Sequence, residues 1–105
     1  MWGMFNNTSN LTSLNLSSFN TSSVTAMSGM FNGASSLTSL DVSSFDTSTV
    51  MNMGSMFTDA SALTSLDLRG WDTGAVTNHT DWLFNTPTVQ IICISGVMVN
   101  GYYCP

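Results

Sequence analysis

The sequence predicts an α/β repeat protein whose coils each contain one short strand and one short helix. Three observations lead to this fold class. Shifting the 105-residue chain by 26 residues brings apolar side chains into alignment in every copy. Each copy holds one stretch with the alternation of a half-buried strand and another with the spacing of an apolar helical stripe. A unit of this size cannot bury its apolar side alone, so the copies are expected to stack into a solenoid.

The repeat is defined by seven apolar columns that run through four copies with no insertion or deletion. They predict three solenoid repeats, 1–26, 27–52 and 53–78, and a degenerate fourth, 79–105, that acts as a C-terminal cap. Terminal repeats are usually atypical because they shield the open end of a stack. The columns are Met4, Met30, Met56 and Trp82; Phe5, Phe31, Phe57 and Leu83; Leu11, Leu37, Leu63 and Val89; Leu14, Leu40, Leu66 and Ile92; Leu16, Val42, Leu68 and Ile94; Phe19, Phe45, Trp71 and Val97; Val24, Val50, Val76 and Tyr102.

Within a copy the strand comes first, over residues 37–42, where L-x-x-L-x-L ends in an apolar–polar–apolar alternation. A hydroxyl-rich turn follows at residues 45–49, and its Ser or Thr can cap the start of a helix. The apolar residues of the next stretch fall at i, i+3, i+6 and i+7, namely Val50, Met53, Met56 and Phe57. This spacing predicts a helix of about two turns with one apolar face.

The composition argues against several classes of function. One Lys or Arg stands against six acidic residues, so the chain offers neither the basic surface that nucleic acid requires nor a polybasic membrane anchor. No apolar run approaches the roughly 18 residues of a membrane-spanning segment. A single His leaves little for acid–base catalysis, and two Cys with one His do not suit a zinc site. We therefore expect no enzymatic activity, cofactor, metal, nucleic-acid partner or membrane insertion.

The repeat unit S-L-T-S-L-D-V-S-S-F-D-T-S-T-V-M-N-M-G-S-M-F resembles the 26-residue repeat of BspA-like bacterial surface proteins. The resemblance is clearest over residues 1–84, and the S-F-D-T-S-x-V and M-x-x-M-F segments are its specific parts. It implies a leucine-rich-repeat-like solenoid of secreted or surface-anchored proteins, many of which are called adhesins. It brings no catalytic residues to this chain.

The last copy keeps the apolar columns but loses the hydroxyl-rich signature, as expected of a cap. Its residues 97–99 and 102–104 flank Asn100-Gly101, which predicts a hairpin with a type I′ turn. Cys93 and Cys104 both lie in this copy, and in a chain that looks secreted they are expected to form an intrachain disulfide. Buried free thiols and an intermolecular bridge are the alternatives.

Strand side chains that point away from the core are expected to form ladders on one face, because coils stack about 4.8 Å apart along a sheet. One ladder is serine, a second is Asn or Asp with Cys93 following it in the cap, and Arg69 belongs to a third. Asp41 and Asp67 would repel each other unless Arg69 or a bound cation relieved them. We expect a ligand face here, with a solvated polar face as the alternative. The ligand-face candidates are Ser13, Asn15, Ser39, Asp41, Ser65, Asp67 and Arg69.

Asn-x-Ser/Thr sequons occur six times, and five of them fall in the first copy. They predict glycosylation, which would help a chain with few charges to stay soluble. Chance is the alternative, because Asn, Ser and Thr are abundant throughout. The candidate asparagines are Asn6, Asn7, Asn10, Asn15, Asn20 and Asn78.

The function predicted from these observations is a non-enzymatic, extracellular element of a cell surface that serves adhesion or structure. Its partners would be a host or matrix protein or a glycan. The alternative is a subunit of an extracellular filament, bare or glycosylated, in which the first coil of one copy stacks on the last coil of the next.

Overall fold

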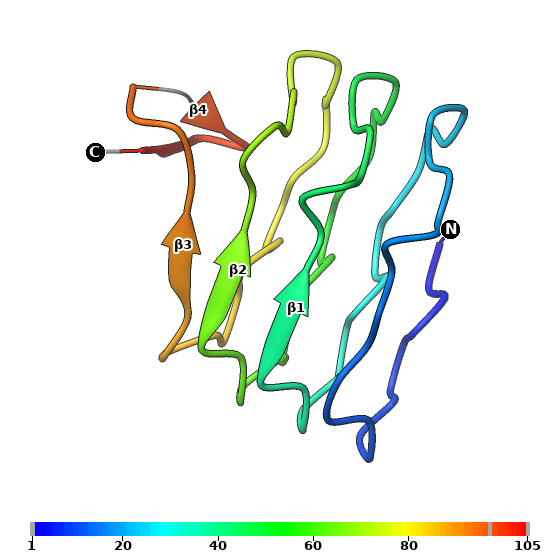
Figure 1. Ribbon diagram of the computed structural model, residues 1–105, viewed down its shortest axis with the longest axis vertical. Helices are drawn as coiled ribbons and strands as arrows, with labels where there is room; N and C mark the ends of the chain where they lie inside the picture. The colour runs from blue at the N-terminus through cyan, green and yellow to red at the C-terminus, as the bar shows by residue number, and fades with distance from the viewer. Residues whose placement is uncertain (1, 97, 105) are drawn as a thin grey trace.

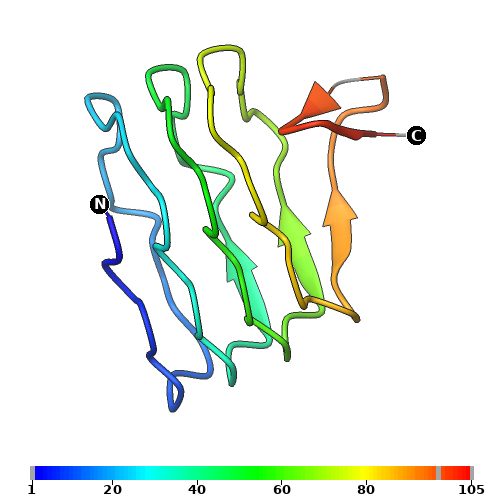
Figure 2. The ribbon, with the colours of Figure 1, turned by 180° about the vertical axis from the view of Figure 1, so that it is seen from behind.

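In the computed structural model, which describes residues 2–96 and 98–104, successive copies of the repeat form flattened coils that lie side by side (Figure 1). One long side of the stack carries a parallel sheet, and the chain returns along the opposite side, which Figure 2 shows. The two chain ends lie at opposite ends of the stack. The strands are β1 (Ser39–Asp41), β2 (Ser65–Asp67), β3 (Gln90–Ile92), β4 (Met98–Val99) and β5 (Tyr102–Tyr103).

The predicted α/β solenoid with a helix in every coil is wrong, because none of the described residues is helical. In the stretch expected to be helical, the backbone amides of Met53, Ser55 and Phe57 donate to carbonyls of the next coil at 2.8–2.9 Å. Ser55 has a φ of 54°, which a right-handed helix does not allow. The apolar residues of this stretch are three positions apart because the chain forms tight turns. In one of these turns the Met56 amide donates to the Met53 carbonyl at 3.2 Å.

The main sheet has the strand order β1-β2-β3, and its neighbouring strands are parallel. Leu40 of β1 pairs with Leu66 of β2, which is 26 residues further along the chain. Leu66 pairs in turn with Ile91 of β3, which is only 25 residues further along. The fourth copy is therefore one residue shorter than the others at the start of its strand.

This deletion overturns the prediction of uninterrupted columns in the fourth copy. Ile92 lies opposite Asp67 and is 41% exposed, so it does not continue the leucine column of the core. Ile94 is 53% exposed and Tyr102 is 36% exposed, so these two also leave their expected columns. Val97, the fourth member of a further predicted column, lies outside the described residues.

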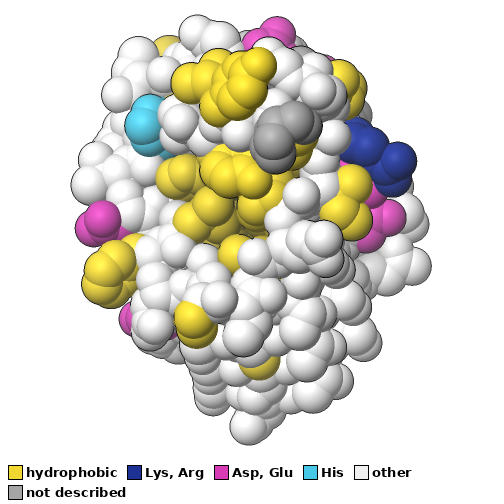
Figure 3. Space-filling view, turned by 90° about the vertical axis from the view of Figure 1, so that its left-hand side faces the viewer, with side chains coloured by type: hydrophobic (Ala, Val, Ile, Leu, Met, Phe, Trp, Pro, Cys, Tyr) yellow, Lys and Arg dark blue, Asp and Glu magenta, His cyan; other side chains and the backbone are white. Residues whose placement is uncertain are grey.

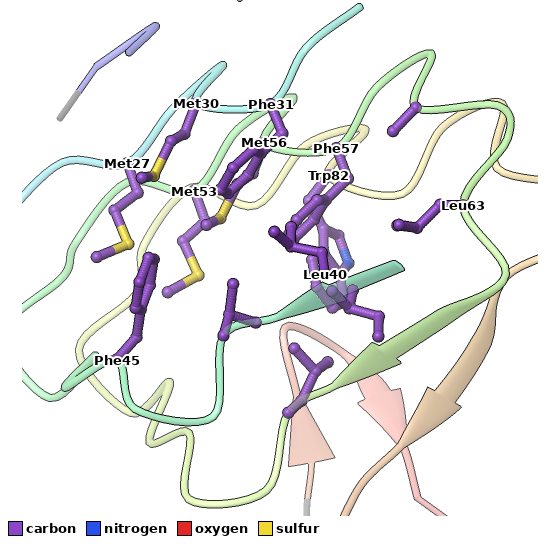
Figure 4. Packing of buried hydrophobic residues seen from close by; sticks show 14 of the residues in the cluster. Met27, Met30, Phe31, Leu40, Phe45, Met53, Met56, Phe57, Leu63 and Trp82 are labelled. Carbon is purple, nitrogen blue, oxygen red and sulfur yellow. The ribbon is translucent and has the colours of Figure 1, made fainter. Parts of the chain in front are cut away.

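One aromatic side chain per copy stacks on the next along the inside of the coils. The ring centroids of Phe5 and Phe31 are 5.5 Å apart and those of Phe31 and Phe57 are 5.4 Å apart, with nearly parallel rings. Trp82 continues the series edge-on to Phe57 at 6.2 Å. Figure 4 shows Phe31, Phe57 and Trp82 beside buried methionines and leucines of the same coils. The same core is thus built in the second and third copies, whose apolar columns are buried throughout except at Val76.

A second internal column consists of threonines. Thr47 is 1% exposed, and its hydroxyl donates to the Asp72 carbonyl and accepts from the Asp72 amide, both at 2.9 Å. Thr21 makes the same pair of hydrogen bonds with Asp46 at 3.1 and 2.8 Å. These hydroxyls satisfy backbone groups at a corner where the coil-to-coil ladder does not reach.

The hairpin predicted for the last copy is confirmed, since β4 and β5 pair in antiparallel fashion around Asn100-Gly101. These two residues have φ values of 49° and 83°, as a type I′ turn requires. The Asn100 amide donates to the Thr73 hydroxyl at 3.2 Å, which repeats the threonine contact of the preceding coils. Val99 is buried in the core. At this corner the hairpin therefore occupies the place of a further coil.

The predicted disulfide is also confirmed, because Cys93 and Cys104 are bonded to each other, with their Cα atoms 6.0 Å apart. The bond ties the segment after β3 to the end of the hairpin. Figure 3 looks onto this end of the stack, where hydrophobic side chains gather at the surface. Three hydrophobic side chains of the fourth copy are more than half exposed, namely those of Phe84, Ile94 and Tyr103.

Candidate functional site

A groove of about 430 Å³ runs across the outer face of the main sheet. It crosses the coils because side chains of a strand alternate between the two faces, which leaves the residue on each side of a core leucine pointing outward. Six of the seven ligand-face candidates meet in it, and Arg69 lies just beyond them. The lining residues are Ser13, Leu14, Asn15, Ser39, Leu40, Asp41, Ser65, Asp67 and Ile92. In this groove Ile92, rather than Cys93 as expected, continues the ladder of Asn and Asp.

The carboxylate of Asp41 is oriented by the turn that follows β1. Its Oδ1 accepts hydrogen bonds from the Ser43 hydroxyl at 2.6 Å and from the Ser43 amide at 2.9 Å. These bonds favour the charged form and hold the pKa of Asp41 below its ordinary value, although the charge of Asp67 opposes this. Asp41 is therefore a fixed negative charge at neutral pH.

Asp67 is paired with the single Lys or Arg side chain of the sequence. The Arg69 guanidinium donates from Nε to Oδ1 at 3.0 Å and from Nη2 to Oδ2 at 2.7 Å. This two-point contact lowers the pKa of Asp67 and raises that of Arg69. The charge of Arg69 also lowers the pKa of Asp41, and so offsets part of the effect of Asp67 on that carboxylate.

The groove also holds hydrogen-bonding atoms that no other described residue satisfies. The second carboxylate oxygen of Asp41 is free, as are the hydroxyls of Ser13, Ser39 and Ser65. A hydroxyl both donates and accepts, whereas a carboxylate only accepts. The groove can therefore bind a ligand that offers several hydroxyl or ammonium groups along the direction of the stack.

The structure reveals a second use for the Asn and Asp residues that the sequence reasoning missed. At three corners of the coil, an Asn or Asp Oδ1 accepts a hydrogen bond of 2.9–3.1 Å from the backbone amide two residues on. Such turns fix a change of chain direction. The sequence does indicate this role, because Asn and Asp replace each other at equivalent positions of successive copies and both side chains carry the accepting oxygen. The residues are Asn15, Asp41 and Asp67; Asn20, Asp46 and Asp72; Asn52 and Asn78.

All six glycosylation candidates have exposed side chains. Asn15, Asn20 and Asn78 belong to the corner turns, so a structural role explains half of the sequons. Asn6, Asn7 and Asn10 lie in turns of the first coil. Glycosylation stays a prediction at every one of these positions.

Coils stacked through a parallel sheet, a polar groove along that sheet and a disulfide-tied hairpin at one end define an all-β repeat protein. The chain belongs to the family described as Mycoplasma protein of unknown function, DUF285, whose model matches residues 1–93. This membership links it to surface-associated repeat proteins without singling out the BspA-like ones. No curated protein and no solved structure matches the chain. In the described part of the chain, no helix has the length and apolar character needed to cross a membrane.

Proposed function

We propose that the chain is a non-enzymatic element of a cell surface that binds a matrix protein or a glycan through the groove on the main sheet. The observation that carries this proposal is that six residues expected from the sequence to contact a ligand line one groove. Family membership and the Cys93–Cys104 disulfide support an extracellular location, because disulfides persist in oxidising surroundings. The resemblance to BspA-like proteins supports adhesion.

The arrangement of the groove suits an elongated, hydroxyl-rich or cationic ligand. Its serine row and its Asn/Asp row run along the stack, and equivalent positions recur about every 4.8 Å. A ligand laid along the stack can therefore meet the same pair of groups in several coils. Charged acceptors such as Asp41 make stronger hydrogen bonds than neutral ones.

The proposal is tested by removing the charges of the groove without disturbing its turns. Asn stands naturally at position 15 of the same column and accepts the same turn hydrogen bond. The double variant Asp41→Asn, Asp67→Asn should therefore keep the fold. Binding to the best ligand on matrix-protein and glycan arrays should fall about tenfold, since charge-assisted hydrogen bonds become neutral ones.

The matched control is Asp46→Asn, Asp72→Asn. These residues have the same turn role at another corner of the coil, outside the groove. This control changes the net charge equally and should leave binding unchanged. Equal losses in both double variants, or no loss in either, would exclude the groove as the ligand face.

The hairpin at the end of the stack argues against the alternative function, a filament in which whole coils stack end to end. The Asn100 amide already bonds to the Thr73 hydroxyl, where the next coil would dock. Val99 fills the adjoining core. A second copy would have to displace the disulfide-tied hairpin before its first coil could stack.

A further inference from the structure

A second polar hollow, of about 320 Å³, lies on the side of the stack opposite the main sheet. Figure 2 shows the segments that form it, residues 2–6, 28–32, 52–55 and 78–80, running side by side. None of the lining residues is charged, whereas the groove on the sheet contains two carboxylates. We propose that this hollow is a separate binding site for a neutral carbohydrate.

Carboxamides of four asparagines converge on the hollow, from two columns of the repeat. Asn52 and Asn78 lie opposite each other in adjacent coils. The Oδ1 atom of each is tied to its corner turn, by the amide of Gly54 at 2.9 Å and that of Thr80 at 3.0 Å. Because Oδ1 is fixed in this way, the Nδ2 group of each side chain is left as an unpaired donor.

The other column, Asn6 and Asn32, has no side-chain hydrogen bond within the described chain. Each of these carboxamides therefore offers a donor and an acceptor side by side. Neighbouring hydroxyls of a sugar ring present the complementary pair, because each hydroxyl both donates and accepts. A fully charged ligand would gain no ion pair in this hollow.

Three glycines, Gly3, Gly29 and Gly54, line the hollow beside these amides. A Cβ atom at position 54 would lie 3.3 Å from the Asn52 Oδ1 atom and 3.4 Å from the Asn78 amide atoms. Gly3 and Gly29, with φ values of 61° and 66°, line the same hollow in the two preceding coils. Their positive φ accounts for glycine at positions 3 and 29, because a side chain strains that backbone conformation.

Trp2 stands at one end of the hollow and is 75% exposed, the largest exposed fraction among the large hydrophobic side chains of the described chain. An indole presents a flat apolar face and one N–H donor. The face matches the C–H groups on one side of a sugar ring, and the carboxamides match its hydroxyls. This combination favours a carbohydrate over a purely polar ligand.

Trp2 also supplies the assay. The other tryptophans, Trp71 and Trp82, are 4% and 7% exposed, so a change at the exposed indole can be followed by fluorescence. The full 105-residue chain, produced in a host without N-glycosylation, would be titrated with cellotriose, maltotriose and mannotriose. Binding of at least one trisaccharide should shift the Trp2 emission to shorter wavelength and protect it from a soluble quencher.

Calorimetric titrations of variants then locate the site. Trp2→Ala should weaken binding about tenfold. The double variant Asn6→Ala, Asn32→Ala should weaken it about threefold to tenfold, and it breaks no hydrogen bond within the described chain. The charge variant of the sheet groove, Asp41→Asn, Asp67→Asn, should bind the trisaccharide as the wild type does.

The possible outcomes separate this proposal from the one made for the groove. Failure of all three trisaccharides to bind would overturn the carbohydrate site and leave the groove proposal untouched. Binding that survives both Trp2→Ala and the double Asn variant would likewise overturn it. Binding lost in the Asp variant alone would assign the sugar to the sheet groove instead.

Discussion

Replacing the buried Thr47 by valine tests how the coils are joined. Valine keeps the shape of the side chain but removes the hydroxyl that exchanges two hydrogen bonds with the Asp72 backbone. Each bond contributes about 1 kcal/mol net, and two backbone groups are left unpaired, so the free energy of unfolding should fall by about 2–3 kcal/mol. For a chain of this size that lowers the melting temperature by roughly 10–20 °C.

The assay is thermal unfolding followed by circular dichroism, with two further Thr→Val variants. Thr73 accepts a single hydrogen bond, from Asn100, so Thr73→Val should lose about half as much stability. Thr38 is exposed and its hydroxyl has no partner in the described chain, so Thr38→Val should stay within about 0.5 kcal/mol of wild type. Equal melting temperatures for Thr47→Val and Thr38→Val would refute the threonine column as a stabilising element.

Further predictions concern the core, the disulfide and pH. Phe31 is fully buried and Phe84 is 61% exposed, so Phe31→Ala should cost about 3–5 kcal/mol in urea unfolding. Phe84→Ala should cost less than about 1 kcal/mol, and similar losses in the two variants would contradict a core built on stacked rings. Replacing Cys93 and Cys104 by serine opens an 11-residue loop and should cost about 3 kcal/mol. In this variant the amides of the hairpin should exchange faster than in wild type, while those of the main sheet stay protected. A uniform loss of protection would show that the disulfide does not act on the hairpin alone. The pKa of Asp41 is lowered in the folded state, so its stabilisation is present above about pH 4 and is lost as the pH falls through the folded pKa. Thermal melts of Asp41→Asn should therefore lose less stability on acidification than those of wild type, and identical pH profiles would show that the Ser43 hydrogen bonds contribute nothing.

The sequence predicted the repeat and the outward ladders, because both follow from the positions of large apolar residues. It did not predict the backbone of residues 50–57 correctly. Apolar residues three apart suit a helix, but they suit successive three-residue turns equally well. The residue that decides between them is Ser55, whose φ of 54° is left-handed. Its mark in the sequence is the glycine at the same position of the two preceding copies, Gly3 and Gly29, because glycine is the usual residue at positive φ.

The one-residue deletion in the fourth copy was hidden by adjacent isoleucines. Ile91 and Ile92 fit the leucine column equally well by composition, and only the pairing of Leu66 with Ile91 shows which of them faces the core. The hairpin and the disulfide were predictable because Asn-Gly and a close pair of cysteines are local signals.

The groove was predictable from strand alternation, but the roles of its residues were only partly so. The sequence suggested that Asp41 and Asp67 repel each other and that Arg69 relieves this, and the Asp67–Arg69 ion pair at 2.7 Å fits that reasoning. It did not reveal that the same carboxylates close turns. Nor did it distinguish the buried Thr47 from the many exposed hydroxyls, because burial depends on which coil packs above it.

The most direct test of the central claim, that the sheet groove is the ligand face, is a two-dimensional NMR titration of the isotope-labelled chain with its best array ligand. If the groove binds the ligand, amide shifts will change along β1 and β2 and at the first-coil residues Ser13 and Asn15, which line the same groove. Shift changes confined to the β4–β5 hairpin, with β1 and β2 unaffected, would contradict it.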